Sequence, residues 1–251
     1  LPGRAGTGFD PSLSRAARIR LTLEELGPTF VKFGQALSLR SDLLPPDVIV
    51  ELVTLQDQVA PLAPGAAEAA IEVELGRPVS RLFASFDPEP LAAASIAQVH
   101  RAVLHSGALV VVKVRRPAIE QLIAGDIEIL SQLARSVERH VPAAAIIDAV
   151  ALVEEFARSI RAELDLVREA RNLERCAANS AGDPTVRFPK VYWDRTTHGV
   201  LTLERLQGLK VSALEAAGAG PYARQLVARR GADLMLAQIL EHGFFHADPH
   251  P

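Results

Sequence analysis

The chain has 251 residues, of which 49% are hydrophobic and only 5% aromatic, and its formal net charge is −3. This length allows one large domain or two modest ones with a sizeable core, and the composition favours helices over an all-β sandwich. The balanced charge excludes a strong basic field that would attract nucleic acid. The single cysteine, Cys176, excludes a disulfide framework and a cysteine-based zinc site, and it suits a reducing compartment.

The sequence contains no pattern that directs it into or across a membrane. Residues 1–4 lead into no apolar segment of the kind found in a signal peptide. The longest weakly polar run, residues 141–153, contains Pro142 and Asp148 and is shorter than the roughly 20 residues that a spanning helix needs. We therefore expect a soluble piece, either cytoplasmic or on the cytoplasmic side of a membrane, and an attachment outside this piece remains open.

The first half of the chain predicts helices followed by a β-hairpin. After a glycine-rich start, helices are expected at about residues 12–26, 29–40, 47–56 and 64–75. Prolines 45 and 46 precede the third helix, where a first turn tolerates them. From residue 91 the pattern becomes short and β-like, with one arm at 96–104, a turn at 105–107 and a second arm at 108–114.

The second half of the chain predicts two long helices, two strands and a last helix. The long helices are expected from Pro117 to about residue 140 and from about 147 to 178, with a stop at residues 182–184. Strands are expected at 187–193 and 200–204, a short helix near Ser212 and a helix at 221–242. This order predicts an α+β fold with a helical extension in front of it.

Lys113 is the only charge in the apolar, mostly β-branched run at residues 109–114. Such a run is typical of a strand that is buried on both faces. A lysine there costs several kcal/mol of desolvation unless an anionic group contacts it. One interpretation is a lysine at a strand end whose ammonium group reaches water. The other is a lysine that contacts a phosphate and a carboxylate.

Glu163 falls in the middle of an apolar stripe on the second long helix, which indicates either that the helical phase is assigned wrongly or that a buried carboxylate with a partner lies there. The stripe consists of Leu152, Phe156, Ile160, Val167 and Ala170. Asp165, Glu169 and Asn172 share another face, where like charges four residues apart repel mildly and a cation or metal would explain them. A solvated acidic face with Arg161 and Arg168 as partners explains Asp165 equally well, but it does not explain Glu163.

A charged and glycine-containing motif, Lys32-Phe33-Gly34-Gln35, lies in the second predicted helix. Lys32 and Gln35 share one side of this helix, and Phe30, Phe33 and Leu37 cluster on the opposite side. Glycine in a helix interior costs about 1 kcal/mol relative to alanine. We therefore expect another backbone to approach Gly34 closely. The pattern alone is also typical of an ordinary amphipathic helix.

The last residues of the chain place Asp248 between two histidines and two prolines, directly after an apolar helical stretch. An aspartate on such a loop is suited to act as the base of a phosphoryl transfer, and it is equally compatible with a solvent-exposed turn. A zinc site is a weaker alternative. His242, His246 and His250 are spaced four residues apart, but Gly243 and the prolines argue against one continuous helix that presents them.

In order along residues 21–251, these motifs resemble those of the UbiB/AarF/ADCK family of atypical protein-kinase-like proteins, which is associated with coenzyme Q and other prenyl-lipid metabolism. The family's K-x-G-Q signature is matched by Lys32 and Gln35, and its alanine-rich loop by Ala92, Ala93, Ala94, Ser95 and Ile96. Its third-strand lysine is matched by Lys113, and the helix glutamate that pairs with this lysine by Glu169. Its E-x-D signature is matched by Glu163 and Asp165, its hinge by Glu204 and Leu206, and its catalytic-loop aspartate by Asp248. Ala97 departs from the family, many of whose members carry glycine at this position.

The resemblance implies a protein-kinase-like α+β fold in three parts. Residues 1–85 would form an N-terminal helical extension with the K-x-G-Q motif, residues 86–206 a kinase-like small lobe, and residues 207–251 the beginning of the large lobe as far as the catalytic loop. The family's further catalytic-loop asparagine and its metal-binding aspartate would lie beyond Pro251. No metal ligand is therefore assigned within this chain, and the fragment alone is expected to be inactive.

The resemblance also implies a site for ATP or ADP with Mg²⁺, formed by the alanine-rich loop, Lys113 and the hinge. Lys113 would pair with Glu169, and Asp248 would act as the base or organise the attacking group. Lys32 would pair with Glu163, so that the extension covers the side where a peptide substrate would lie.

Two functions follow from the resemblance. The full-length protein is expected to hydrolyse ATP or phosphorylate a small molecule in support of ubiquinone or other prenyl-lipid biosynthesis. The alternative is a nucleotide-binding scaffold that binds a lipid or a partner enzyme. Expected partners are adenine nucleotide, a prenyl lipid or quinone precursor, quinone-biosynthesis enzymes and a membrane surface, but no nucleic acid.

Overall fold

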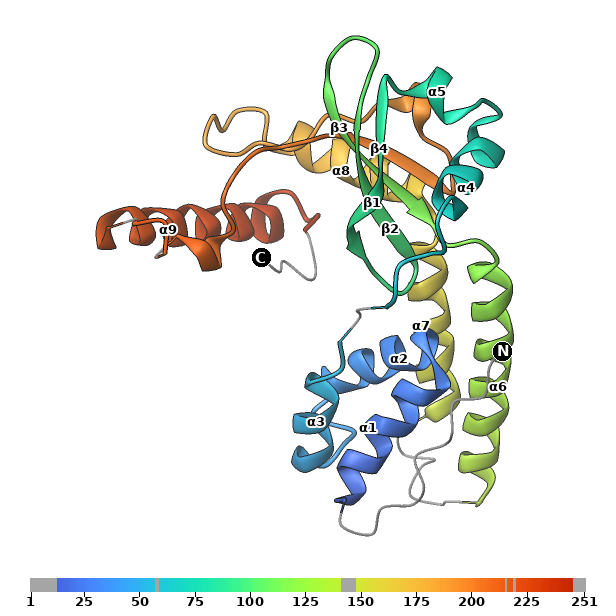
Figure 1. Ribbon diagram of the computed structural model, residues 1–251. Coiled ribbons are helices and arrows are strands. Elements are labelled where there is room, and N and C mark those ends of the chain that lie inside the picture. The colour runs from blue at the N-terminus through green and yellow to red at the C-terminus, as the bar shows by residue number, and fades with distance from the viewer. Residues whose placement is uncertain (1–12, 57–58, 141–147, 215, 219, 246–251) are drawn as a thin grey trace. The chain divides into compact units, whose positions relative to one another are not determined.

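The computed structural model describes residues 13–56, 59–140, 148–214, 216–218 and 220–245 (Figure 1). The chain divides into two compact units, each built from segments that are distant in sequence. Unit 1 contains the described parts of residues 1–70, 90–98 and 115–164, and unit 2 contains those of residues 71–89, 99–114 and 165–251. The division of the sequence at residues 85 and 206 into family-like parts stays a prediction.

Three short helices at the start of unit 1 pack on one another. They are α1 (Arg15–Leu26), α2 (Pro28–Ser38) and α3 (Pro46–Val53), and they confirm the first three predicted helices. The end of α1 agrees with the prediction, whereas α2 and α3 end two or three residues earlier. The Ser14 side chain accepts a hydrogen bond from the Ala17 N–H and caps α1. The core between these helices consists of Ala16, Val31, Val48, Leu52 and Leu55.

Gly34 lies where α2 faces this core, but the reason for the glycine differs from the expected one. A Cβ atom at Gly34 would lie 2.5 Å from Leu55 Cδ1 and 2.8 Å from Leu23 Cδ1. The close approach therefore comes from leucine side chains, and the expectation of a neighbouring backbone is wrong. The glycine leaves room for leucines that α1 and the end of α3 contribute to the core.

Replacing Gly34 by alanine is expected to destabilise the protein by about 1–3 kcal/mol, because the added methyl group overpacks these leucines. Gly125 in the interior of helix α6 (Ile119–His140) is the matched control, since nothing lies within 4 Å of a Cβ built there. Gly125→Ala should stabilise by about 0.5–1 kcal/mol through helix propensity. Urea denaturation of both variants measures the difference, and equal effects would contradict the packing argument.

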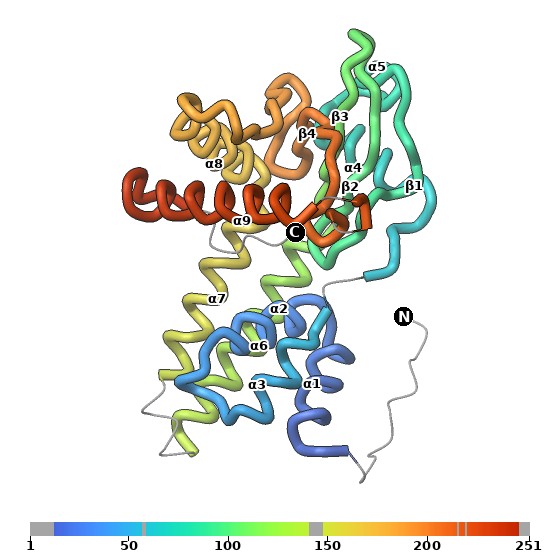
Figure 2. The backbone as a smooth tube through the Cα atoms, turned by 90° about the vertical axis from the view of Figure 1, so that its left-hand side faces the viewer, coloured from blue at the N-terminus to red at the C-terminus, as the bar shows by residue number. Residues whose placement is uncertain are grey.

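The main core of unit 1 lies between α6 and α7 (Ala149–Glu163), which run side by side in both views (Figures 1 and 2). Both helices contribute a buried apolar stripe, as their sequence periodicity requires. The cluster also includes Phe30 of α2 and Ile96 of the alanine-rich loop. These two residues anchor the extension and the loop in one core.

The predicted helix at about residues 147–178 is two helices, α7 and α8 (Leu166–Asn179). The helix is interrupted at Asp165, which adopts an extended conformation and is the N-cap of α8. Its carboxylate accepts hydrogen bonds from the Val167 and Arg168 N–H groups. The expectation that Asp165, Glu169 and Asn172 share one helical face is therefore wrong for Asp165. The boundary between the two units also falls between Leu164 and Asp165.

A four-stranded sheet has the order β1 (Ser85–Ala93), β2 (Ala97–Val103), β3 (Leu109–Arg115) and β4 (Val200–Glu204). The predicted hairpin is confirmed as β2 and β3, and its turn contains Gly107 with φ of 84°. β4 pairs antiparallel with β3, which sets Lys113 opposite Leu201. Much of β1 was not predicted because it contains two prolines, which an edge strand tolerates.

Two strand predictions need correction. Residues 187–193 form no strand in the described chain; Val191 makes one isolated bridge to Leu203, and a 3₁₀ turn follows at Trp193–Arg195. β3 is not buried on both faces, because burial alternates along it. Val110, Val112 and Val114 are fully buried, whereas Lys113 lies on the other, partly exposed face.

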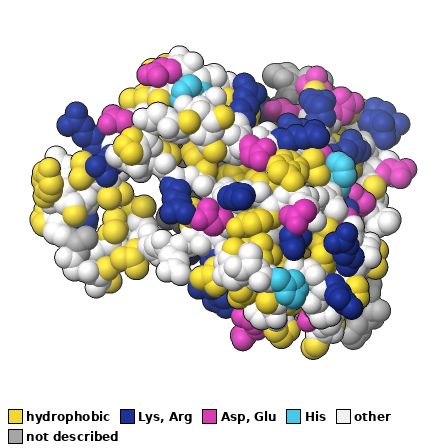
Figure 3. Space-filling model, turned by 90° about the horizontal axis from the view of Figure 1, so that it is seen from above, with side chains coloured by type: hydrophobic (Ala, Val, Ile, Leu, Met, Phe, Trp, Pro, Cys, Tyr) yellow, Lys and Arg dark blue, Asp and Glu magenta, His cyan; other side chains and the backbone are white. Residues whose placement is uncertain are grey.

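The remaining described helices precede β1 or follow β4 in the sequence. They are α4 (Ala66–Leu75), the unpredicted α5 (Val79–Leu82), a 3₁₀ turn at Val211–Ala213, and α9 (Pro221–Leu236), which continues as a π-helix at Ala237–Glu241. None of the helices in the described ranges is both long enough and apolar enough to cross a bilayer. On the face shown in Figure 3, lysine and arginine side chains are interspersed with acidic and apolar ones.

Candidate functional site

The first part of the candidate site is an ion pair between a strand and a helix of unit 2. Lys113 Nζ on β3 lies 2.7 Å from Glu169 Oε2 on α8. Glu169 is in the first turn of α8, where the helix dipole favours a negative charge. The predicted pairing is therefore confirmed. The Lys113 and Glu169 side chains are 29% and 41% exposed, so the pair is half-buried rather than fully enclosed as the apolar run suggested.

The predicted hinge residues, Glu204 and Leu206, lie at the end of β4 and just after it, in the same unit. The Glu204 carboxylate, which ends β4, accepts hydrogen bonds from the Arg187 guanidinium and the Lys190 N–H. The Glu204 N–H donates to the Lys190 carbonyl, and the Arg205 N–H donates to the Leu109 carbonyl. These bonds fix the segment after β4, whereas the side chain of Leu206 is exposed.

The alanine-rich loop belongs to unit 1. Ala92 and Ala93 end β1, and Ala94, Ser95 and Ile96 make the turn to β2, which the Ala94 N–H closes by donating to the Ala97 carbonyl at 2.9 Å. Ser95 is 1% exposed, and its hydroxyl has no hydrogen-bond partner in the described part of the chain. The loop therefore combines small methyl side chains with a buried hydroxyl group that lacks a hydrogen-bond partner among the described residues.

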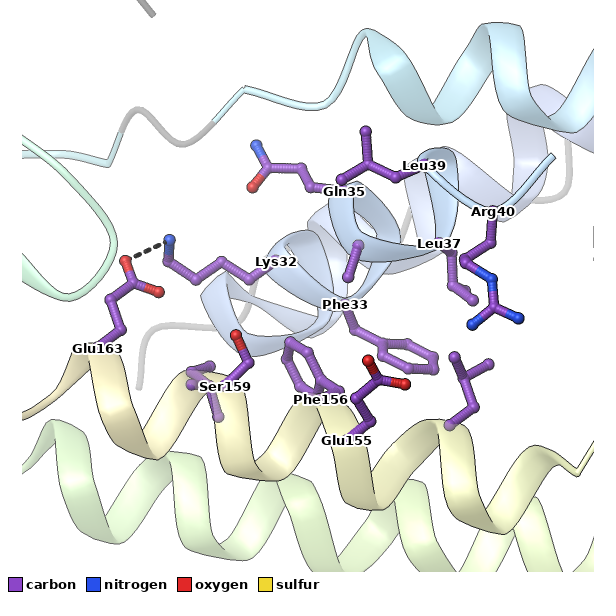
Figure 4. Close-up of a pocket in the computed structure, with 13 residues that line it drawn as sticks. Lys32, Phe33, Gln35, Leu37, Leu39, Arg40, Glu155, Phe156, Ser159 and Glu163 are labelled. Carbon is purple, nitrogen blue, oxygen red and sulfur yellow. Dashed lines mark hydrogen bonds and ion pairs between the residues drawn. The ribbon is translucent and has the colours of Figure 1, made fainter. Parts of the chain in front are cut away.

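The second predicted ion pair lies within unit 1 and joins α2 to α7. Lys32 Nζ lies 2.8 Å from Glu163 Oε1, which confirms the predicted pairing (Figure 4). Glu163 was expected to be buried, but its side chain is 47% exposed because it is the last residue of α7 and Leu164 takes the buried position. The Gln35 side chain donates to the Leu55 carbonyl at 3.0 Å and links α2 to the segment that follows α3.

A pocket of about 330 Å³ opens between α2 and α7, and sequence analysis did not predict it. Its apolar part includes Phe33 and Phe156, whose rings meet edge to face with centroids 5.1 Å apart. Figure 4 shows Lys32 and Glu163 at one end and Arg40 near Glu155 at the other. An apolar floor with charged ends suits a small amphipathic molecule.

Asp165, the last residue of the E-x-D motif, is held in its ionised form by hydrogen bonds. Burial raises its pKa, but the Arg168 N–H, the His198 ring and the Val167 N–H together outweigh this and lower the pKa below its ordinary value. His198 Nδ1 donates to Asp165 Oδ1 at 2.8 Å. Asp165 therefore stabilises the start of α8, the helix that carries Glu169.

The lowered pKa predicts a pH-dependent contribution of Asp165 to stability. A carboxyl group with a depressed pKa in the folded state stabilises at neutral pH, and this contribution is lost as the pH falls through that pKa. The ordinary value is 3.8, so Asp165→Asn should lower the melting temperature near pH 7 and lose this effect below about pH 4. Asparagine is also a good N-cap, so the change removes the charge alone. Thermal unfolding of both proteins across this range is the measurement, and a pH-independent difference would contradict the prediction.

Asp248, the predicted catalytic residue, lies outside the described residues, and so does the rest of the loop from His246 through His250 to Pro251. The catalytic role of Asp248, the zinc alternative and the metal ligands expected beyond Pro251 all stay predictions. Within the described residues, no group of three or more histidine, cysteine or acidic side chains is arranged to hold a metal ion.

Three residues that hold these motifs in place were missed by sequence analysis. His198 bonds the Asp165 carboxylate, Arg115 donates to the Leu164 carbonyl, and Arg116 donates to the Ala94 carbonyl of the alanine-rich loop. The two arginines directly follow the apolar run at residues 109–114, and this position was the one sequence signal that could have marked them as structurally important.

A sheet whose strand lysine pairs with a glutamate on a neighbouring helix is the arrangement of the small lobe of protein kinases. The fold and site therefore define a kinase-like protein. The family model described as the ABC1 atypical kinase-like domain matches residues 54–251, and the chain belongs to this family.

Relatives and a solved structure agree with this assignment. A "Probable protein kinase UbiB" from Cellvibrio japonicus (strain Ueda107) is 46% identical over 241 residues, which are 96% of this chain and 44% of that protein. A protein of the same name from Aeromonas salmonicida (strain A449) is 46% identical over 242 residues, again 96% of this chain and 44% of that protein. The chain thus spans less than half the length of these relatives.

The fold comparison leads to the same family of structures. "The complex structure of Rv3197-erythromycin from Mycobacterium tuberculosis" matches with a TM-score of 0.67 and 25% identity, over 94% of this chain and 59% of that one. The predicted fold class, α+β and protein-kinase-like with N-terminal helices, is confirmed.

Proposed function

We propose that the full-length protein binds Mg²⁺ and adenine nucleotide and acts as an atypical kinase or ATPase of the UbiB type. The observation that supports this most strongly is the 2.7 Å pair of Lys113 and Glu169. Glu169 holds the lysine side chain in place, and the partly exposed ammonium group retains donors for phosphate oxygens. Family membership adds that the relatives are named probable protein kinases.

The other residues of the proposed site have complementary tasks. Ala92, Ala93, Ala94, Ser95 and Ile96 would let phosphate groups approach the backbone, and Glu204 and Leu206 would contact the nucleotide base. Asp248 would accept a proton from the attacking group or orient it. Mg²⁺ would neutralise the charge that develops on the phosphates, and its ligands are proposed in the part of the relatives that this chain does not span.

We further propose that Lys32 and Glu163 restrict the acceptor. Their ion pair joins α2 to α7 within unit 1, so the N-terminal helices are held against the helix that ends at the E-x-D motif. In the resembled family this contact belongs to an extension that covers the side where a peptide would lie, and on that ground we propose ATP hydrolysis or phosphorylation of a small molecule rather than of a peptide. The proposed biological context is ubiquinone or other prenyl-lipid biosynthesis at a membrane surface.

The pocket between α2 and α7 favours a second candidate, a nucleotide-binding scaffold that binds a lipid-like molecule. The apolar floor at Phe33 and Phe156 would contact a ring or short chain, and the charged ends would contact its polar group. The solved structure from Mycobacterium tuberculosis is described as a complex with erythromycin, which supports ligand binding in this fold.

Two measurements on the full-length protein test these proposals. Calorimetry with Mg·ADP and Mg·ATP measures binding, and phosphate release from Mg·ATP measures turnover. Binding with turnover supports the kinase or ATPase, and binding without turnover supports the scaffold. Failure to bind either nucleotide would overturn both.

A further inference from the structure

Arg116, which directly follows β3, is bonded to three points of unit 1. Its backbone N–H donates to the Ile96 carbonyl at 2.8 Å, and its side-chain Nε donates to the Ala94 carbonyl at 2.9 Å. Its Nη2 donates to the Ala60 carbonyl at 2.8 Å. Ala94 and Ile96 flank Ser95 in the alanine-rich loop, and Ala60 lies in the segment between α3 and α4.

These bonds require an arginine rather than a positive charge in general. The guanidinium group is a planar fork with several donors in fixed directions, so one side chain can bind two carbonyls that belong to different segments. A lysine ammonium group is a compact charge without this geometry. Neighbouring Arg115 has different partners, since it donates to the Leu164 carbonyl and pairs with Glu120.

The loop has few other means of being held. Ala92, Ala93 and Ala94 offer only methyl groups, the Ser95 hydroxyl has no partner among the described residues, and Ile96 alone reaches the core. The segment at Ala60 is held against the same region a second time, because the Leu62 N–H donates to the buried Gln98 side chain at 3.0 Å. Arg116 therefore joins the turn of the loop to the chain that leads from the N-terminal helices.

From this geometry we infer that Arg116 is a positioning residue, which fixes the backbone of the alanine-rich loop and ties it to the segment at Ala60. The inference rests on the proposed function in one respect, namely that the loop contacts nucleotide phosphates. Backbone groups that bind phosphate act best when they are held in place before the ligand arrives. Arg116 would supply that rigidity without touching the nucleotide.

Two variants of the full-length protein separate geometry from charge. Arg116→Gln removes the fork and the charge, and Arg116→Lys keeps the charge alone. Arg101→Gln is the matched control, because Arg101 is a partly exposed arginine of the neighbouring strand β2 that pairs with Asp87. The Arg116 variants should fold, because the bond to Ala60 lies at the surface and the bond to Ala94 is only partly buried. Arg101→Gln should fold because both partners of the Arg101–Asp87 pair are partly exposed.

The first readout is hydrogen exchange of a peptide that covers residues 92–98. Exchange should be about tenfold faster in Arg116→Gln and Arg116→Lys than in the wild type and in Arg101→Gln, which corresponds to about 1.4 kcal/mol of local opening. This readout does not depend on nucleotide binding, so it tests whether Arg116 holds the alanine-rich loop in place even if the proposed function is wrong. Unchanged exchange in both Arg116 variants would overturn the inference, and so would full rescue by lysine.

The second readout is the dissociation constant for Mg·ADP with the thermal midpoint measured in parallel. Both Arg116 variants should bind about tenfold more weakly, while Arg101→Gln stays within about twofold of the wild type. A merely structural residue would lower the thermal midpoint and leave the affinity of the folded protein unchanged. Faster exchange with unchanged affinity would overturn the link between the loop and the nucleotide.

Discussion

Replacing Lys113 by methionine in the full-length protein is expected to lower kcat/KM for Mg·ATP by about 100-fold or more, with little change in stability. The ammonium group is the cation proposed to contact the phosphates, and loss of a preorganised donor to a developing charge commonly costs this much. The pair with Glu169 is half-exposed, so its loss should lower the free energy of unfolding by at most about 1 kcal/mol. Fully buried pairs would cost several times more when one partner is removed.

Glu169→Gln tests the same pair from the other side. The lysine would keep its charge but lose the carboxylate 2.7 Å away that fixes its position, so a smaller loss of turnover than in Lys113→Met is expected. Lys190→Met is the control, because Lys190 is a lysine of the same unit whose ammonium group lies over the Tyr192 ring. If Lys113→Met turned over as fast as this control, the proposed phosphate contact would be wrong.

The parts of this fold that sequence predicted well are those fixed by local patterns. Short β-like segments, one of them an apolar and mostly β-branched run, and a glycine in the turn specified the β2–β3 hairpin, and Pro117 specified the start of α6. The two lysine–glutamate pairs were predicted from motif resemblance, since their partners are 56 and 131 residues apart in sequence. No local pattern could have paired them.

Other features depend on tertiary contacts that periodicity does not encode. The predicted apolar stripe around Glu163 required one continuous helix. Asp165 instead caps a new helix, so residues before and after Asp165 do not lie on the same helical face. The burial of β3 on one face and the leucines around Gly34 depend likewise on which elements pack nearby. Arg116 binds backbone carbonyls, and a carbonyl leaves no signature in the sequence.

Replacing Asp248 by asparagine in the full-length protein is expected to reduce kcat by about 10²–10⁴-fold, the usual contribution of a general base. Asparagine has nearly the same shape but cannot accept a proton, so the substitution removes the chemistry and retains the size. Nucleotide affinity should remain within about threefold of the wild type, because the proposed phosphate contact is made by Lys113 rather than by this group.

Asp233→Asn is the matched control, since Asp233 is an exposed aspartate of α9, four residues from Arg229, and it should leave kcat unchanged. Single-turnover measurements at saturating Mg·ATP separate the chemical step from binding. If Asp248→Asn bound nucleotide and turned over like this control, Asp248 would not be the base. If wild type and variant both bound nucleotide without turnover, the scaffold that binds an amphipathic molecule between α2 and α7 would be the better description, because nucleotide would then act as a ligand rather than a substrate.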